Sequence, residues 1–410
     1  MYKSRTSRRK KSGFSQQNTK HNNTMLLFDL IRKHSPISRI KLAEMTGLSA
    51  TTVSMLVEEL MYNDLVMEIG RGDTTMRGRK PILLQINGAG AYIGVIEVIN
   101  TGFNCYLYDL LCERVDTYKY RTDGGGEHPV VEIMTELLRR NQIPEERLIG
   151  VNVDYPGIVD RRNAKLIYSA VISADRYLDN DDIAQLQQRF PHAHIEVNNN
   201  SSIAAYAAHM SNGFRYDETI LYVNMFEAIG AGAIIVNEKG DRVYDFPIEM
   251  GHVMVDSNGQ QCKCGNHGCL EQAAGACQIF KRINEETDLS FEYSDEFLSE
   301  ENVVCMEMLG QKLQEGNEQV RTVLEDIAQK TATAIVTVNN ILDPGDIFIG
   351  GLIKYLGEEF IEMVHKYVDS MNILPSAAAR KIHISQMDFK TRSKGAANMI
   401  LDSVFAITNE

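Results

Sequence analysis

The sequence has no apolar stretch approaching the roughly 20 residues that a helix needs to cross a bilayer. Its basic start is not followed by the apolar core of a signal peptide, because Asp29 interrupts the short run Met25–Phe28. We therefore expect a cytoplasmic chain with no membrane partner. With 44% hydrophobic and 24% charged residues, the composition is that of an ordinary globular protein.

Positive charge is scarce after the first quarter of the chain. Residues 1–90 hold 15 Lys and Arg against 7 Asp and Glu, a net charge of +8; because the whole chain carries −13, the rest carries −21. A basic head on an acidic body indicates that only the head meets a polyanion. At 410 residues, two or three domains are expected. Residues 1–20 are predicted to be a disordered basic arm, either part of this head or an extraneous tail.

Residues 21–88 have the pattern of a winged helix-turn-helix. Small Ala43, then Gly47 in a turn and Val53 in the core, follow one another at the spacing of a helix-turn-helix. The third helix has one apolar stripe at helical spacing. Helices are predicted over residues 24–33, 38–45 and 49–63, and strands over residues 65–69 and 82–86.

A basic, glycine-containing segment between those two strands predicts a DNA-contacting wing. Small polar residues at the start of the third helix suit an approach to the major groove. A helical domain that binds protein is the alternative, but the wing and the charge asymmetry favour double-stranded operator DNA. The predicted DNA contacts are Ser49, Ala50, Thr51, Thr52 and Ser54 near base edges, and Arg71, Arg77, Arg79 and Lys80 near phosphates or the minor groove.

From about residue 88 onward, strands alternate with helices, which indicates an α/β architecture. Each predicted strand is a short apolar run, and each helix has a longer apolar pattern. Strands are predicted over residues 92–96, 105–110, 148–153, 195–197, 219–224, 232–236 and 347–349, and helices over residues 130–140, 202–210 and 323–342.

Three of the seven cysteines, Cys262, Cys264 and Cys269, are clustered. The first two are too close for an easy mutual disulfide, and a cytoplasmic chain keeps its thiols reduced. Three thiolates and one imidazole form a closed tetrahedral zinc site, for which His252 and His267 are both candidate fourth ligands. Free surface thiols are the alternative.

Four segments of the body together resemble the ROK family (repressors, open reading frames and kinases). They are Tyr155–Asp160, Glu249–His252, Cys262–Glu271 and Leu342–Gly351. The resemblance runs from about residue 20 to the C-terminus. Residues 77–81 also resemble the join between wing and body in the family's repressors, of the xylose-repressor or N-acetylglucosamine-repressor type.

This resemblance implies an actin-like, hexokinase-like fold of two lobes with the ligand in the cleft, and a homodimer or higher homo-oligomer. Residues 89–200 would form the first lobe, completed by the C-terminal helix at about 388–410, and residues 201–387 the second lobe with the zinc motif.

The resemblance also implies a sugar site. In the family's kinases an Asn-Asp pair, a Glu-x-x-His motif and the Glu after the last zinc cysteine hold the sugar hydroxyls. The resemblance further selects His252 as the fourth zinc ligand. One nitrogen of this ring would then bind zinc, and the other would contact a sugar hydroxyl. Structural polar residues with satisfied hydrogen bonds are the alternative. The matching sugar contacts are Asn199, Asn200, Glu249, His252 and Glu271, and the structural zinc ligands are His252, Cys262, Cys264 and Cys269.

Three departures from the kinase pattern argue against catalysis. Asn200 replaces the family's catalytic Asp, and an amide cannot accept the hydroxyl proton. Glu97–Thr101 replaces a first phosphate loop of the form Asp-x-Gly-Gly-Thr, and lacks the glycines that let backbone N–H groups approach phosphate. Phe226–Gly232 replaces the second loop, Gly-Thr-Gly-Ile-Gly-x-Gly, where Glu227 would place a negative charge near phosphate.

Together these features predict a DNA-binding transcriptional regulator and not an enzyme: a repressor of carbohydrate-utilisation genes that a sugar effector releases. Two alternatives stay open. One is an active sugar kinase. The other is a regulator controlled by a protein partner without sugar binding, which the changed contact at Asn200 keeps open.

Overall fold

The computed structural model describes residues 16–71, 81–99, 101–122, 128–169, 178–211, 219–236, 242–294, 299–371 and 381–406. The predicted DNA contacts Arg77, Arg79 and Lys80 lie outside these residues, as does most of the arm expected at 1–20. The chain divides into two compact units. Unit 1 comprises residues 1–92, 109–113 and 401–410, and unit 2 comprises residues 93–108 and 114–400. No helix of the described residues is both long and apolar enough to span a membrane.

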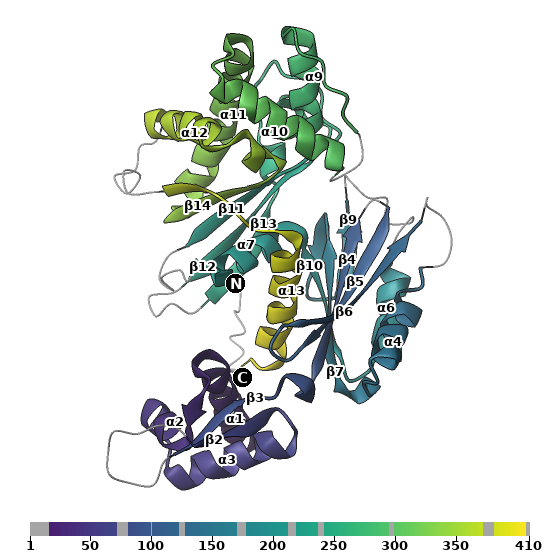
Figure 1. The fold of residues 1–410 in the computed structure, drawn as a ribbon, viewed down its shortest axis with the longest axis vertical. Helices are drawn as coiled ribbons and strands as arrows, with labels where there is room; N and C mark the ends of the chain where they lie inside the picture. Colours follow the sequence, from purple (N-terminus) through teal and green to yellow (C-terminus); the bar gives the residue numbers. More distant parts are fainter. Residues whose placement is uncertain are drawn as a thin grey trace, which may run out of the picture. The chain divides into compact units, whose positions relative to one another are not determined.

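The described residues of unit 1 form three helices, the end of the C-terminal helix and a small antiparallel sheet in the order β1-β3-β2. This arrangement is consistent with the predicted winged helix-turn-helix (Figure 1). Its elements are α1 (Gln16–His34), β1 (Ile37–Ser38), α2 (Arg39–Thr46), α3 (Ala50–Tyr62), β2 (Val66–Arg71), β3 (Ile82–Ile86) and the 3-10 turn η1 (Gly88–Gly90).

The turn between α2 and α3 forms for local reasons. Gly47 ends α2 at a φ of 70°, a left-handed conformation that glycine adopts without strain, and its N–H donates to the Ala43 carbonyl. Ser49 then caps α3, because its side chain accepts a hydrogen bond from the Thr52 N–H. The apolar stripe of α3 is buried as predicted, and the unit 1 core includes Leu27, Phe28, Ile31, Leu42, Val53, Leu56, Val57, Leu60, Leu84 and Ile86.

Helix α1 begins earlier than expected. Disorder was predicted to residue 20, whereas the helix starts at Gln16. The Lys20 ammonium lies 2.8 Å from the Glu59 carboxylate of α3, and the Thr24 hydroxyl donates to the Lys20 carbonyl at 3.0 Å. These contacts stabilise the first turns of the helix, so residues 16–20 belong to the helix and not to the predicted arm.

The last described residues belong to unit 1, although they were expected to complete the first lobe of the body. From Leu401 onward the C-terminal helix α13 (Phe389–Val404) is part of unit 1. There the Phe405 ring stacks on Phe28 with centroids 4.0 Å apart, and Asp402 pairs with Arg32 at 2.7 Å. Pairing between positions so far apart in sequence leaves no local pattern, so the sequence could not separate the end of this helix from residues 389–400, which belong to unit 2.

The first sheet of unit 2 has the order β10-β7-β4-β5-β6. Helices α4 and α6 cover one of its faces (Figure 1), where Gly94 of β4 makes room for the Met134 side chain of α4. A hairpin, β8-β9, follows β7. The elements are β4 (Tyr92–Ile99), β5 (Gly102–Asp109), β6 (Arg114–Arg121), α4 (Val130–Arg140), η2 (Glu145–Arg147), β7 (Leu148–Tyr155), β8 (Ile158–Asp160), β9 (Lys165–Tyr168), α6 (Asn180–Arg189) and β10 (His194–Asn199).

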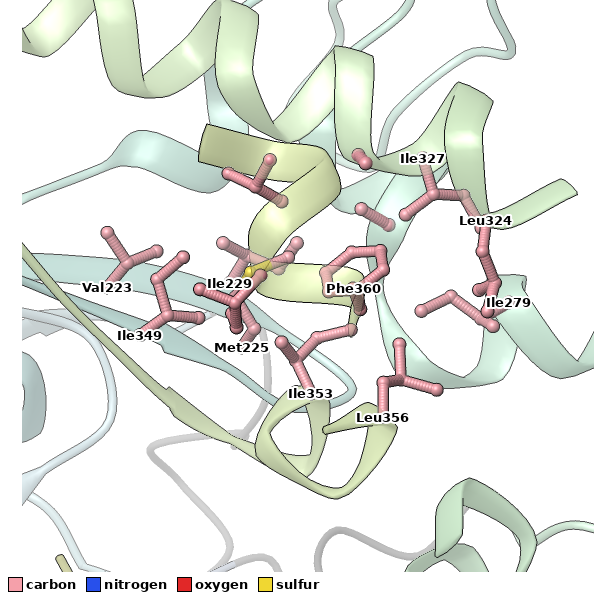
Figure 2. Packing of buried hydrophobic residues seen from close by; sticks show 14 of the residues in the cluster. Val223, Met225, Ile229, Ile279, Leu324, Ile327, Ile349, Ile353, Leu356 and Phe360 are labelled. Atoms are coloured by element: carbon pink, nitrogen blue, oxygen red, sulfur yellow. The ribbon is translucent and has the colours of Figure 1, made fainter. Parts of the chain in front are cut away.

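The second sheet has the order β13-β12-β11-β14-β15 and packs on a large apolar core. Figure 2 shows Phe360 among residues from the sheet and from the surrounding helices. Strand β11 is buried along its whole length, as an apolar central strand should be. The elements are α7 (Asn200–Ser211), β11 (Ile220–Met225), β12 (Ile229–Val236), β13 (Arg242–Ile248), η3 (Met250–His252), α8 (Leu270–Ala274), α9 (Ala276–Glu286), α10 (Glu300–Gln314), α11 (Glu318–Leu342), β14 (Asp346–Gly351), η4 (Leu352–Leu356), α12 (Glu358–Met371) and β15 (Lys381–Ile384).

Helix α13 packs on the first sheet through a buried ion cluster. The Arg392 guanidinium pairs with Glu97 of β4, and its Nε lies 3.2 Å from the Asp154 carboxylate of β7. The other oxygen of Glu97 accepts hydrogen bonds from Tyr106 and Asn104, each at 2.8 Å. Burial raises the pKa of Asp154 to about 7, although the Arg392 charge opposes the shift.

This raised pKa predicts how stability depends on pH. Between the ordinary value of 3.8 and about 7, the folded chain keeps a proton at Asp154 that the unfolded chain has lost. The contribution of Asp154 to the free energy of unfolding therefore falls as pH rises through that window. Asp154→Asn removes this contribution, so the stability of the variant relative to wild type should increase from about pH 5 to about pH 8 in denaturant unfolding. A difference that stays constant would contradict the assignment.

Candidate functional site

A cavity of about 70 Å³ opens in unit 2 where the first sheet and α7 meet the second sheet and its loops. All five predicted sugar contacts line it. Asn199 and Asn200 stand at the end of β10 and the start of α7, Glu249 and His252 follow β13, and Glu271 belongs to α8. The further lining residues are Pro156, Gly157, Ser201, Asn224, Phe226, Ala228, Ile229, Gly230, Ala231, Pro247 and Ile248.

Asn199 and Asn200 differ in how firmly the fold holds them. The buried Asn199 amide donates to the Gly157 carbonyl at 2.7 Å, and its oxygen accepts from the Ser201 and Ser202 N–H groups at the start of α7. Asn200 is half-buried, and its side-chain oxygen accepts a single long hydrogen bond of 3.4 Å from Ser201. Asn199 therefore has a structural task whatever it binds, whereas Asn200 keeps most of its capacity for a ligand.

Two carboxylates and one imidazole give the pocket its charge. Partial burial raises the pKa of the Glu249 carboxyl; His252 opposes this shift, and the nearby Glu271 carboxylate adds to it. Glu271 is oriented by the Ile229 N–H, which donates to its Oε2 at 3.1 Å. Acceptors of this kind, beside an amide and an imidazole, match the hydroxyl donors of a polyol.

The clustered cysteines and His252 form a compact group of four possible metal ligands. One ligand atom from each of His252, Cys262, Cys264 and Cys269 lies within 4.8 Å of the other three. The Cys262 sulfur is 3.6 Å from His252 Nδ1, and the Cys264 and Cys269 sulfurs are also 3.6 Å apart. A tetrahedral zinc site with bonds near 2.3 Å needs ligands roughly 3.8 Å apart, so this donor set fits the ion. His267 is exposed and is not part of the group.

The loop that carries the cysteines also positions Glu271. Cys269 directly precedes α8, and the Leu270 N–H donates to the Val253 carbonyl at 2.9 Å. Gly268 is required here, since any Cβ at this position would lie 1.5 Å from the Asp256 carbonyl oxygen. Metal ligands and pocket wall are therefore parts of one loop. His252 faces the cysteines through Nδ1, which leaves Nε2 for a ligand.

The two segments that were predicted to replace kinase phosphate loops have acidic side chains engaged within unit 2. Glu97 is held by Arg392, Tyr106 and Asn104, as described above. The Glu227 carboxylate accepts a hydrogen bond of 3.0 Å from the buried Asn302 of α10. Each carboxylate is thus part of the packing of unit 2.

The predicted DNA contacts of α3 lie at or near its start. Ser49, Ala50 and Thr51 are exposed, whereas Thr52 and Ser54 are half-buried. Arg71 is the last residue of β2. These positions stay predictions, because nothing bound to the head is present to test them.

Sequence reasoning missed two groups of residues that shape this unit. Asn224 and Phe226 line the pocket from the end of β11, and an apolar strand followed by a turn was a usable signal for them. Arg392 and Asp154 had no such signal, because their pairing joins β7 to a helix more than two hundred residues later in the chain.

Comparisons with known proteins agree with these features. The model of the ROK family matches residues 93–402. The xylose repressor of Bacillus subtilis (strain 168) is 33% identical over 276 residues, which cover 66% of this chain and 70% of that protein. A solved ROK family transcriptional regulator, a homolog of the E. coli MLC protein, covers 95% of this chain and 97% of its own at a TM-score of 0.74 and 18% identity. A ROK family glucokinase from Streptomyces griseus covers only 75% of this chain, although 99% of its own, at a TM-score of 0.55 and 15% identity.

The two asparagines make a matched pair for a stability test. Asn199→Ala removes the side-chain acceptor at the start of α7 and should lower the free energy of unfolding by about 0.5–2 kcal/mol. Asn200→Ala removes only one long hydrogen bond and should change it by less than about 0.5 kcal/mol. Denaturant unfolding of both variants measures the difference, and equal effects would contradict the capping role of Asn199.

Proposed function

Because the chain belongs to the ROK family, we propose that it is a sugar-responsive transcriptional repressor whose head binds operator DNA. The observation that carries this proposal is the coexistence of two parts in one chain. The head has a capped third helix after a tight turn, and the body has a pocket with two carboxylates, an imidazole and an amide. The first part suits duplex DNA and the second a small polyhydroxylated ligand.

The effector is a neutral monosaccharide or a close derivative. Glu249, Glu271 and Nε2 of His252 hold its hydroxyls, with Asn199 and the uncharged Asn200 on the opposite wall. A charged sugar phosphate would meet two carboxylates, which disfavours it.

The cysteine loop holds a structural zinc ion through His252, Cys262, Cys264 and Cys269. The ion supplies no chemistry beyond its bonds: it fixes the loop that carries Glu271 and orients the imidazole that faces the sugar. The spacing of the four donors supports this assignment.

The protein does not phosphorylate its sugar. Asn200 is in the place of a general base and cannot accept a proton. Glu97 is bound to Arg392, and Glu227 to Asn302, so both replaced loops serve packing within unit 2. No ATP-dependent turnover near the roughly 1–100 per second of ordinary kinases is therefore expected.

Helix α13 couples the pocket to the head. Its Arg392 pairs with Asp154, which lies two residues before Pro156 in the pocket wall. Its end belongs to unit 1, where Asp402 pairs with Arg32 of α1. Sugar binding alters the pocket wall, and α13 transmits the change to the head. In a homodimer, this changes the distance between the two recognition helices, which must match half-sites about one helical turn apart.

A binding assay on the full chain tests this function. The operator probe is a duplex selected from a random library by the protein itself, and the sugar panel contains xylose, N-acetylglucosamine and glucose. One sugar should weaken operator binding by about 5- to 150-fold, a coupling of about 1–3 kcal/mol. Glu249→Ala should bind the duplex like wild type without responding to sugar, whereas Glu307→Ala, an exposed control on α10, should still respond.

Deletion of residues 1–88 should abolish duplex binding, and the affinity of the full chain should fall steeply with salt because phosphate contacts release counterions. Retained binding by the truncated protein would refute the DNA-binding role of the head. If Glu249→Ala and Glu271→Ala both respond to the inducing signal like wild type, a protein partner and not the pocket is the sensor.

Elemental analysis of protein purified without chelator tests the zinc site. One zinc per chain is expected in wild type, in His267→Ala and in Cys277→Ser, whose cysteine lies outside the cluster. Cys264→Ser and His252→Ala should lose zinc and melt at lower temperature, because metal binding energy contributes to folding. Wild-type protein without zinc would rule out the site.

A further inference from the structure

One face of α3 presents a stripe of exposed side chains that extends beyond the predicted DNA contacts. Thr51, Met55, Glu58 and Tyr62 are all exposed and recur at spacings of four, three and four residues, so they share one side of the helix. Val53, Leu56, Val57 and Leu60 are buried on the other side. Met55 is 51% exposed, so its apolar side chain is accessible to a bound partner.

Two of the predicted base contacts are used in capping α3. The Ser49 hydroxyl accepts from the Thr52 N–H at 3.1 Å and shares a second hydrogen bond of 2.8 Å with the Thr52 hydroxyl. Each hydroxyl therefore already has a partner within the chain. Recognition of bases must therefore depend more on the residues further along the stripe, such as Met55 and Glu58.

Glu58 differs from the other glutamates of the head in its ion pairing. Three of the four glutamates within residues 16–71 pair with a cation: Glu44 with Lys41 at 3.1 Å, Glu59 with Lys20 at 2.8 Å and Glu68 with Arg39 at 2.8 Å. Within the described residues of the head, Glu58 has no ion-pair partner. A bare carboxylate on a DNA-facing helix repels phosphate, and the base edge that compensates best is the N4 amino group of cytosine.

We propose that Glu58 and Met55 set the base preference of each operator half-site: Glu58 accepts a hydrogen bond from a cytosine N4 amino group, and Met55 packs on the C5-methyl group of a thymine. The two residues are three apart on the helix, a rise of about 4.5 Å. Side chains three residues apart are neighbours on one helix face, so both can reach adjacent base pairs. The proposal rests on the proposed DNA-binding function of the head.

Selection from a randomised duplex library tests the proposal with the full chain. Wild type should enrich a motif with one fixed cytosine and an adjacent fixed thymine in each half-site. Glu58→Ala should lose the preference at the cytosine alone, by roughly 5- to 150-fold, and should bind unselected DNA more tightly because a negative charge is gone. Met55→Ala should lose only the thymine preference.

Two controls separate base reading from folding. Glu59→Gln changes the neighbouring, ion-paired glutamate and should leave the selected motif unchanged. Ser38→Ala removes the cap of α2, where the Ser38 side chain accepts from the Lys41 N–H, and should lower the melting temperature without changing which bases are preferred. The tighter binding of Glu58→Ala to unselected DNA should diminish as salt rises, because the repulsion that the substitution removes is screened by salt.

The outcomes distinguish this inference from the function on which it rests. If wild type enriches no motif at all, the DNA-binding function fails. If wild type enriches a motif that Glu58→Ala and Met55→Ala both reproduce unchanged, the function stands and the proposed reading by α3 is wrong. Glu58→Ala should lose the preference at a position where wild type selects cytosine. If wild type selects another base at that position, the proposed pairing of Glu58 with cytosine is also wrong.

Discussion

The buried guanidinium of Arg392 is the contact on which the geometry of unit 2 depends most. It pairs with Glu97 and also contacts Asp154 on the neighbouring strand, whose pKa is raised by burial, and none of the three groups meets water freely. Loss of Arg392 would leave the buried Glu97 charge unpaired, at a cost of about 3–5 kcal/mol. The cluster therefore fixes the position of α13 along the first sheet. Apolar contacts alone would define that position less sharply, because they are not directional.

The ion cluster around Arg392 connects two segments of the chain that have different proposed roles. Asp154 lies two residues before the segment that lines the pocket, and α13 ends in unit 1, which carries the predicted helix-turn-helix. His252 has a comparable double role, with one nitrogen toward the cysteines and the other left for the pocket. The residues that would bind the effector are thus held by the same contacts that hold the fold, and a ligand can bias one arrangement over another.

Local signals were enough to predict much of this structure. Gly47 and Ser49 indicated the turn and the cap of α3, and helix α4 and strand β3 have the predicted bounds because an apolar pattern is bounded by clear breaks. All five proposed sugar contacts line one cavity, since the family motifs carry them at fixed places relative to strand ends. The spacing of the cysteine loop left His252 and His267 open; the family resemblance selected His252, and in the fold it is His252 that lies beside the cysteines.

What was missed depends on contacts between distant parts of the chain. The early start of α1 follows from Lys20 meeting Glu59, and the assignment of the C-terminus to unit 1 follows from Phe405 and Asp402 meeting α1. The pairing of Arg392 is of the same kind. Neither periodicity nor propensity encodes which charge meets which across hundreds of residues, so these contacts had no sequence signal.

The central claim is that pocket and head are two sites of one switch, and thermodynamic reciprocity tests it directly. Calorimetric titration of the inducing sugar into the full chain, alone and saturated with its selected duplex, measures the coupling. The account predicts that DNA weakens sugar binding by the same factor by which sugar weakens DNA binding, about 5- to 150-fold. Equal sugar affinity in the two titrations would contradict it.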